Sequence, residues 1–229
     1  MEEWRQLLYP LGLLSTLAFG ARFIVQWLES ERKGMSIVPL SFWQLSLIGN
    51  ILLTLHSMIQ SQFPVAIAQV CNSIISWRNL NLLQVKKPPV SFHTVLTILL
   101  TCCTLIILYF IMQQTFFFPK TEAWFRIPLA PWENEKTYDL SLGWHLLGFV
   151  GYLLFSSRFW IQWWFAEKAY QSYLPLSFWW LSLIGAVMSN LYFLYISDIV
   201  NLIGPVIGLV PYIRNLMLIY AKKKVSQST

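Results

Sequence analysis

Long apolar stretches alternate with short polar segments along the whole chain. A helix needs about 20 mostly apolar residues to cross the hydrocarbon core of a bilayer. Seven stretches have this length, and they lie at residues 7–28, 40–60, 63–84, 90–112, 142–165, 176–196 and 199–220. The pattern therefore predicts an all-α integral membrane protein with seven transmembrane helices.

The first apolar stretch lies where a signal peptide would lie, but it is predicted to be a retained span. Glu2 and Glu3 precede it in place of basic residues, Arg22 interrupts it, and no small-residue cleavage site follows it. The connection 113–141 is too polar to span and too long to be a tight turn. It is therefore predicted to be an extramembrane loop.

Composition supports the membrane prediction. The chain has 229 residues, of which 56% are hydrophobic and only 11% are charged, whereas a soluble domain has about 25% charged residues. The net charge of +6 comes from 16 Lys and Arg against 10 Asp and Glu. In a soluble protein this excess would raise the question of nucleic acid. In a membrane protein the excess of basic residues is first a signal of orientation across the bilayer. No nucleic-acid partner is predicted.

The basic residues of the loops predict the orientation of the chain. One side of the membrane receives Arg5, Lys120, Arg126 and Lys136, and the other receives Arg32, Lys33, Lys86, Lys87, Lys168, Lys222, Lys223 and Lys224. Cytoplasmic loops are the ones enriched in Lys and Arg. The N-terminus is therefore predicted to lie outside and the C-terminus in the cytoplasm.

The chain contains an internal repeat at an offset of 136 residues. The segment 22–27 recurs at 158–163, and 39–43 recurs at 175–179. Each copy holds three spans, and the span 90–112 restores the orientation between them, which predicts a three-plus-one-plus-three plan with parallel repeats. The predicted domains are repeat 1 at 7–84, the linker helix 90–112 with its loop within 85–141, repeat 2 at 142–220, and a basic cytoplasmic tail at 221–229.

Four arginines fall inside the spans, two in each repeat: Arg22, Arg78, Arg158 and Arg214. A charge within the membrane usually faces protein or water, because its cost at the bilayer centre is about 2.5–3.5 kcal/mol on insertion scales. One interpretation is that each guanidinium reaches the interface and only fixes topology. The other is a site for a phosphorylated ligand, because forked donors suit phosphate.

Further polar side chains accompany these arginines at equivalent depths. Residues four apart share a helix face, so Gln26 lies beside Arg22 and Gln162 lies beside Arg158. The candidate anion-binding residues, besides the arginines, are Gln26, Trp27, Asn79, Gln162, Trp163 and Asn215. Trp27, Trp163 and Trp164 equally suit an interfacial aromatic belt.

A second set of repeated residues is predicted to serve motif geometry and helix packing. These residues are Ser36, Pro39, Trp43, Ser46, Gly49, Ser172, Pro175, Trp179, Ser182 and Gly185. Glycine and serine allow helices to approach closely within a membrane. Pro205 and Pro211 predict kinks or breaks in the seventh span, which the first repeat lacks.

No catalytic or metal-binding constellation is present in the sequence. Cys71, Cys102 and Cys103 have no metal-ligand spacing and are predicted to be buried, inert thiols. The three histidines are scattered, and no nucleophile elbow or glycine-rich phosphate loop occurs. No cofactor and no metal is predicted, and enzyme activity is left open.

Three ordered motifs, each present twice, resemble those of the lipid A biosynthesis N-terminal domain. The motifs R-F-x-x-Q-W, S-x-x-P-x-x-F-W-x-x-S-x-x-G and R-N-L lie at 22–27, 36–49 and 78–80, and again at 158–163, 172–185 and 214–216. The three-helix unit is also similar to those of PQ-loop and SWEET transporters. Their doubled members have the same three-one-three plan.

The resemblance implies a place in lipopolysaccharide synthesis. That family occurs at the front of some lipid-A-disaccharide synthases, notably chlamydial ones, which join UDP-2,3-diacylglucosamine to 2,3-diacylglucosamine 1-phosphate. The sequence contains no soluble glycosyltransferase portion, so it is expected to be either a standalone membrane protein or the membrane part of a split synthase.

Three functions follow from this resemblance and from the repeat plan. The first is a module of the bacterial inner membrane that binds phosphorylated acyl-glucosamine intermediates or anchors a glycosyltransferase partner at the inner leaflet. The second is a SWEET-like carrier or flippase for a sugar or a lipid-linked sugar. The third is an assembly subunit without a ligand. Anionic or phosphorylated membrane lipids are the expected partners in the first case.

Overall fold

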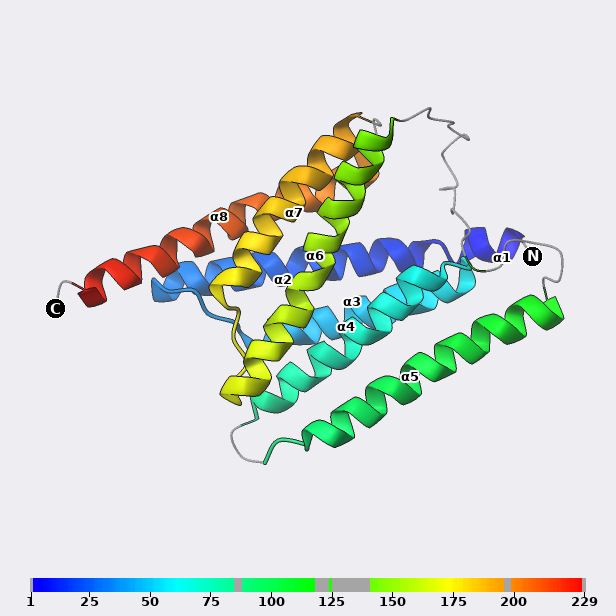
Figure 1. Ribbon diagram of the computed structural model, residues 1–229, viewed down its shortest axis with the longest axis horizontal. Helices are drawn as coiled ribbons and strands as arrows, with labels where there is room; N and C mark the ends of the chain where they lie inside the picture. The colour runs from blue at the N-terminus through cyan, green and yellow to red at the C-terminus, as the bar shows by residue number, and fades with distance from the viewer. Residues whose placement is uncertain (1, 85–87, 118–123, 125–140, 196–198, 228–229) are drawn as a thin grey trace. The chain divides into compact units, whose positions relative to one another are not determined.

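The computed structural model describes residues 2–84, 88–117, 124, 141–195 and 199–227, and every regular element in these ranges is helical. The elements are α1 (Glu2–Leu7), α2 (Pro10–Lys33), α3 (Leu40–Ile59), α4 (Phe63–Leu82), α5 (Phe92–Met112), the π-helical turn η1 (Gln113–Phe117), α6 (Leu142–Ala169), α7 (Leu176–Tyr195) and α8 (Ile199–Gln227) (Figure 1). The predicted all-α class is confirmed for this part of the chain.

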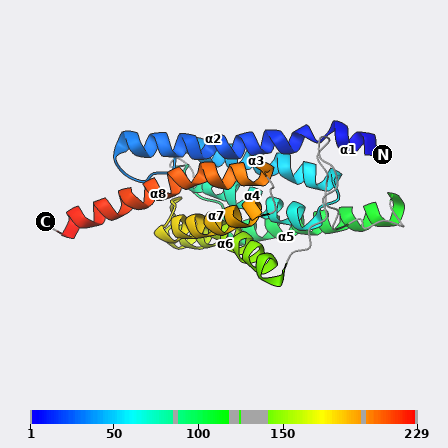
Figure 2. The same cartoon turned by 90° about the horizontal axis from the view of Figure 1, so that it is seen from above.

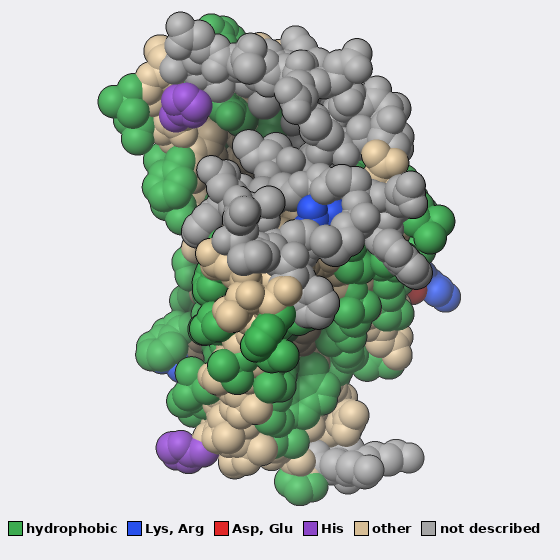
Figure 3. Space-filling view, turned by 90° about the vertical axis from the view of Figure 1, so that its right-hand side faces the viewer, with side chains coloured by type: hydrophobic (Ala, Val, Ile, Leu, Met, Phe, Trp, Pro, Cys, Tyr) green, Lys and Arg blue, Asp and Glu red, His purple; other side chains and the backbone are tan. Residues whose placement is uncertain are grey.

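Each of the seven predicted stretches overlaps one long helix, and α2, α6 and α8 extend beyond their stretches at the C-terminal end. Within the described residues, four helices are long and apolar enough to cross a membrane: Arg5–Lys33, Leu40–Ile59, Phe92–Phe116 and Leu176–Tyr195. The other long helices, α4, α6 and α8, are those that contain Arg78, Arg158 and Arg214. Membrane crossing by all seven therefore stays a prediction. The face drawn in Figure 3 carries mainly hydrophobic side chains in its described part.

The chain divides into two compact units. Unit 1 consists of Met1–Phe19 and Trp43–Lys136, and unit 2 consists of Gly20–Phe42 and Thr137–Thr229. Their boundaries lie inside α2 and near the start of α3, whereas the predicted repeats meet at the linker helix. The larger part of α2 therefore packs with the helices of the second repeat.

In unit 2, α6 packs against α7 and α7 packs against α8 (Figures 1 and 2). Close approach of α6 and α7 depends on Gly185, where an added Cβ would lie 2.9 Å from the Phe155 backbone nitrogen and 3.0 Å from the Gly151 carbonyl oxygen. Phe178 and Tyr212 are buried between these helices. A side chain at position 185 would therefore meet the backbone of α6.

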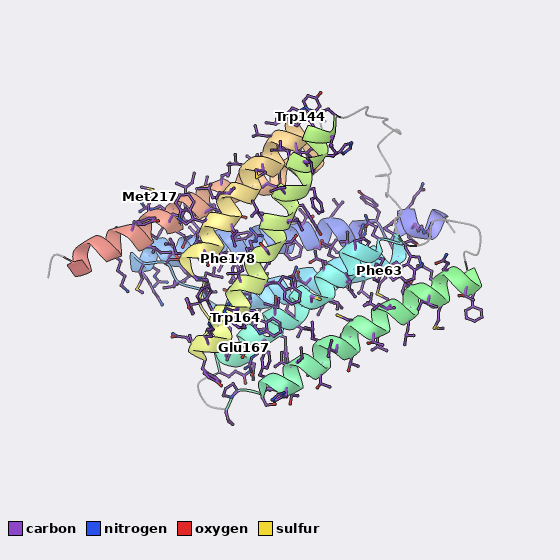
Figure 4. All side chains as sticks on the ribbon, in the orientation of Figure 1. Phe63, Trp144, Trp164, Glu167, Phe178 and Met217 are labelled. Atoms are coloured by element: carbon purple, nitrogen blue, oxygen red, sulfur yellow. The ribbon has the colours of Figure 1, made fainter. Side chains whose placement is uncertain are left out.

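In unit 1, α4 packs against α5. Their contact includes Phe63, whose ring centre lies 5.4 Å from that of Phe110 in an edge-to-face arrangement (Figure 4). Gly49 allows a close contact within this unit, since an added Cβ would lie 2.6 Å from the Phe19 ring. Cys71 and Cys103 are free thiols whose sulfur atoms lie 3.7 Å apart.

The turns after α2 and α6 have the same geometry. The residue after each helix has a left-handed backbone, with φ of 61° at Gly34 and 48° at Tyr170. Two backbone hydrogen bonds close each turn, from Gly34 and Met35 in the first and from Tyr170 and Gln171 in the second. This geometry reverses the chain within a few residues.

Helix α8 contains Pro205 and Pro211 without ending at either. The Asn215 side chain donates a hydrogen bond of 2.8 Å to the Pro211 carbonyl, one turn earlier. Most of the predicted loop 113–141 lies outside the described residues. The same holds for the topology-setting residues Lys86, Lys87, Lys120, Arg126 and Lys136.

Candidate functional site

Two of the four predicted arginines, Arg22 from α2 and Arg158 from α6, lie together in unit 2. Their guanidinium carbons are each 5.0 Å from the centre of the Phe159 ring. Arg22 is 5% exposed and Arg158 is 1% exposed. Both also lie over Phe23, at 4.8 Å and 5.5 Å. The repeat-related arginines therefore share one aromatic cluster and repel each other electrostatically.

The Arg158 guanidinium is the centre of this cluster. It lies 3.5 Å from the Phe155 ring centre, 5.5 Å from that of Phe178 and 5.7 Å from that of Tyr212. Aromatic faces attract cations, and the attraction is stronger away from water. The cluster therefore lowers the cost of burying the charge, but it supplies no negative charge to neutralise it.

Hydrogen bonds hold only one side of the Arg158 guanidinium. Its Nη1 donates to the Ser182 hydroxyl at 3.2 Å and to the Tyr212 hydroxyl at 3.1 Å. In the described part of the chain, Arg158 has no carboxylate partner, and its buried Nε has no acceptor. Ser182, predicted to serve packing, thus also contacts the arginine.

A pair of buried amides joins α2 to α8 within unit 2. Gln26 Nε2 donates to Asn215 Oδ1 at 2.8 Å, and Asn215 Nδ2 donates back to Gln26 Oε1 at 3.0 Å. Ser36 donates to the same Asn215 oxygen at 2.6 Å. Both amide side chains are fully buried. These predicted ligand residues are therefore extensively bonded to one another.

Gln26 and Gln162 hold the two repeat-related turns. Gln26 donates to the Ile37 carbonyl at 2.9 Å, and Gln162 donates to the Tyr173 carbonyl at 3.0 Å. Each glutamine thereby ties its helix to the carbonyl eleven residues later. The structure therefore gives both side chains an architectural role.

Arg214 has an acidic partner in unit 2. Glu31, near the end of α2, accepts hydrogen bonds from Arg214 Nε and from Arg214 Nη2, the latter at 2.9 Å. The Arg214 side chain is 41% exposed and the Glu31 side chain is 33% exposed. Sequence distance concealed this pair, because the two residues are 183 positions apart.

Arg78 lies in unit 1 and has a different environment from its repeat counterpart Arg214. It is 1% exposed, and its Nη1 donates to Asn81 Oδ1 at 2.9 Å and to the Val90 carbonyl at 2.7 Å. It therefore holds the segment that leads from α4 into α5. Asn79 is also buried in unit 1 and donates to the Ile75 carbonyl at 2.9 Å.

The predicted tryptophans divide into bonded and exposed ones. Trp27 donates to Glu31 at 3.1 Å, and Trp163 donates to Glu167 at 2.7 Å, each pair being one turn apart. Trp164 is 62% exposed near the end of α6, beside Glu167 and at the opposite end of the helix from Trp144 (Figure 4).

The remaining motif residues surround the starts of α3 and α7. Pro39 and Pro175 immediately precede these helices, and their carbonyls accept from the backbone of Phe42 and Phe178. The buried members of the set are Trp43, Ser46, Gly49, Ser172, Trp179, Ser182 and Gly185. Trp43 and Trp179 have no exposed surface, and Trp179 Nε1 has no acceptor in the described part of the chain.

Tyr212 and Phe155 are the site residues that sequence reasoning missed. Phe155 precedes Arg158 by three positions, so helical spacing placed them on one face. Tyr212 has no such signal, because its repeat counterpart is Ser76. Among the described residues, no group of three or more His, Cys, Asp or Glu side chains is arranged to hold a metal ion.

The fold and this site define a class, namely all-helical proteins with membrane-length apolar helices and buried arginines. A sequence profile described as the lipid A biosynthesis N-terminal domain matches residues 11–81 and again residues 147–217. Residue 147 is 136 positions after residue 11, and residue 217 is 136 positions after residue 81. The chain belongs to the lipid A biosynthesis N-terminal domain family.

Curated relatives carry the name lipid-A-disaccharide synthase. The chain is 38% identical to that of Chlamydia felis over 96% of its length, 39% identical to that of Chlamydia abortus over 97%, and 38% identical to that of Chlamydia pneumoniae over 95%. In each case the match covers 34% of the relative, so the chain spans about a third of the length of these relatives. No solved structure matches the chain.

Proposed function

We propose that this chain is a membrane module of lipid A biosynthesis that binds acylated, phosphorylated glucosamine intermediates. Family membership and the name of the chlamydial relatives support the pathway. The helices with membrane-length apolar segments support a site within or beside a bilayer. An acylated ligand would place its chains among such helices and present its phosphate to the protein.

One observation carries the binding role. Arg22 and Arg158, from equivalent positions in the two repeats, are buried in a single cluster, and Arg158 has no carboxylate partner among the described residues. A buried charge such as that of Arg158 is costly without a counter-charge. A phosphate supplies that charge together with acceptor oxygens of the right geometry.

The proposed architecture has seven spans in two parallel three-helix repeats joined by α5, with a SWEET-like plan. Contacts that recur at the 136-residue offset support it, since Gly49 with Phe19 has its counterpart in Gly185 with Phe155. The proposed location is the bacterial inner membrane, with the N-terminus outside and the C-terminus in the cytoplasm. Fusion of a periplasm-active reporter at the C-terminus should be inactive, while a cytoplasm-active reporter there should be active.

The binding proposal is tested with 2,3-diacylglucosamine 1-phosphate and the purified chain in nanodiscs of zwitterionic lipid. Arg158→Gln should weaken binding at least tenfold. Arg32→Gln, which removes a side chain that is 81% exposed, is the matched control and should leave binding unchanged. Equal affinities for the Arg158 variant and the unsubstituted chain would contradict the proposal.

A carrier for a sugar or lipid-linked sugar is the second candidate, because parallel repeats of this kind occur in transporters. The recurring glycine contacts support the repeat plan, and this plan suits a carrier as well as a binding module. Counterflow of labelled ligand in proteoliposomes separates the candidates. Binding without counterflow supports a binding module, whereas saturable counterflow that Arg158→Gln abolishes supports a carrier.

A further inference from the structure

Unit 2 contains a group of buried hydrogen-bond donors with unused capacity. Arg158 Nε and Trp179 Nε1 have no acceptor in the described ranges, although the two side chains are 1% and 0% exposed. The Tyr212 hydroxyl accepts from Arg158, and no described acceptor takes its own hydrogen. Buried donors are normally satisfied, so each exception calls for an explanation.

These donors lie close to one another. The Arg158 guanidinium is 5.7 Å from the Tyr212 ring centre, and the Tyr212 and Trp179 ring centres are 6.3 Å apart. The second charge is that of Arg22. The guanidinium groups of Arg22 and Arg158 both lie 5.0 Å from the Phe159 ring centre. The cluster therefore combines two positive charges with donors from α6, α7 and α8.

The charge selects the chemical class of ligand. A phosphate monoester carries close to two negative charges near neutral pH and offers three terminal oxygens. A phosphodiester carries one negative charge and has fewer free oxygens. Arg158 Nε, the Tyr212 hydroxyl and Trp179 Nε1 can each meet one terminal oxygen of a monoester, whereas a diester has too few free oxygens to meet all three beside the Arg158 charge.

Within the described ranges, this combination of an arginine, a tyrosine and a tryptophan occurs in unit 2 and is not repeated at the equivalent positions of the first repeat. Tyr212 corresponds to Ser76 in the first repeat, and Arg22 of the first repeat already belongs to the cluster in unit 2. One arginine from each repeat, Arg22 and Arg158, therefore lies in the same cluster. The duplication supplies two equivalent arginines, and the structure gathers both charges in one cluster.

We infer that Arg158, Tyr212 and Trp179, together with Arg22, form a single site that binds a phosphate monoester in preference to a diester. This inference rests on the proposed function and deepens it, because it distinguishes a sugar 1-phosphate from a nucleotide-linked sugar. Tyr212 and Trp179 determine specificity by donating to the phosphate oxygens, while the arginines balance its charge.

The test uses native mass spectrometry of the full chain with two lipid probes in a phosphatidylcholine background. Phosphatidic acid is the monoester probe and phosphatidylglycerol is the diester probe. One phosphatidic acid should be retained per chain, with affinity at least tenfold higher than for phosphatidylglycerol. Inorganic phosphate is added in a third arm, where displacement of phosphatidic acid indicates that the headgroup alone suffices and retention indicates a lipid site. Either result supports the single site.

Conservative variants test the donors while keeping the packing. Tyr212→Phe and Trp179→Phe should each weaken retention of phosphatidic acid, by about tenfold for Tyr212→Phe, because a hydrogen bond to a charged group is lost. Tyr220→Phe and Trp180→Phe are the matched controls, since these side chains are 48% and 41% exposed. Their binding should equal that of the unsubstituted chain.

Three results would overturn the inference: equal retention of the two lipids, two equivalent phosphatidic acids per chain, or unchanged binding by Tyr212→Phe. A purely structural role for Tyr212 would lower thermal stability without changing the preference for the monoester. Retention of phosphatidic acid without any binding of 2,3-diacylglucosamine 1-phosphate would contradict the proposed function and still support the site.

Discussion

Gln26 of α2 and Asn215 of α8 exchange a reciprocal pair of side-chain hydrogen bonds, at 2.8 Å and 3.0 Å, although 189 residues separate them. Both side chains are fully buried in unit 2. Within an apolar environment an amide without partners is expensive. The pair therefore fixes which part of α2 packs against α8.

Replacement of either amide should destabilise unit 2. Asn215→Leu leaves both polar atoms of Gln26 short of a partner and should lower the free energy of unfolding by roughly 2–4 kcal/mol. The double variant Gln26→Leu with Asn215→Leu should lose less than the sum of the single variants. Reversible unfolding in detergent measures all three, and strictly additive losses would argue against a direct coupling.

Loss of Arg214 should affect ligand binding much less than loss of Arg158. Glu31 already neutralises Arg214, and both side chains are partly exposed, so their ion pair contributes little. Arg214→Gln should bind 2,3-diacylglucosamine 1-phosphate with unchanged affinity in the nanodisc assay. A tenfold loss would mean that Glu31 releases Arg214 when the ligand binds.

The two repeat-related glycines should differ in their tolerance of a methyl group. At Gly185 the added Cβ meets the backbone of α6, which cannot move alone, whereas at Gly49 it meets the Phe19 ring. Gly185→Ala should cost roughly 2–3 kcal/mol and Gly49→Ala about 1 kcal/mol, since a side chain adjusts more easily than packed backbone. Comparison of the two unfolding midpoints checks this order, and a reversed order would contradict it.

The left-handed turn residues provide a second matched comparison. Gly34 has open space where a Cβ would be, so Gly34→Ala tests only its φ of 61° and should cost about 1 kcal/mol. Tyr170 occupies the equivalent conformation at a φ of 48° and is 74% exposed. Tyr170→Gly should therefore be more stable than Tyr170→Ala. Equal stabilities would show that the backbone at this turn relaxes freely.

Local properties of the chain were predictable from the sequence. Each helix was located because a run of apolar side chains of membrane length is a local signal. The motif residues were found because the duplication places them twice at one offset. The position of Arg22 and Gln26 on one helix face also follows from their spacing alone.

Long-range partners were not predictable in the same way. The pairing of Arg214 with Glu31 and the bonds of Gln26 to Asn215 depend on how α2 packs against α8, and no local pattern encodes that choice. Tyr212 escaped notice for the same reason, since its hydroxyl gains a role only when α8 brings it to Arg158.

The sequence by itself determined the helices, the apolar character, the repeat and the identity of the cations within the helices, because these depend on residue type and spacing. Only the tertiary structure decided which cations share an environment. It joined Arg22 and Arg158 in one aromatic cluster, paired Arg214 with an acid, and gave Arg78 a place in the connection to α5. The physical reason is that electrostatic and hydrogen-bond energies depend on distance in space, which packing sets, and not on separation along the chain.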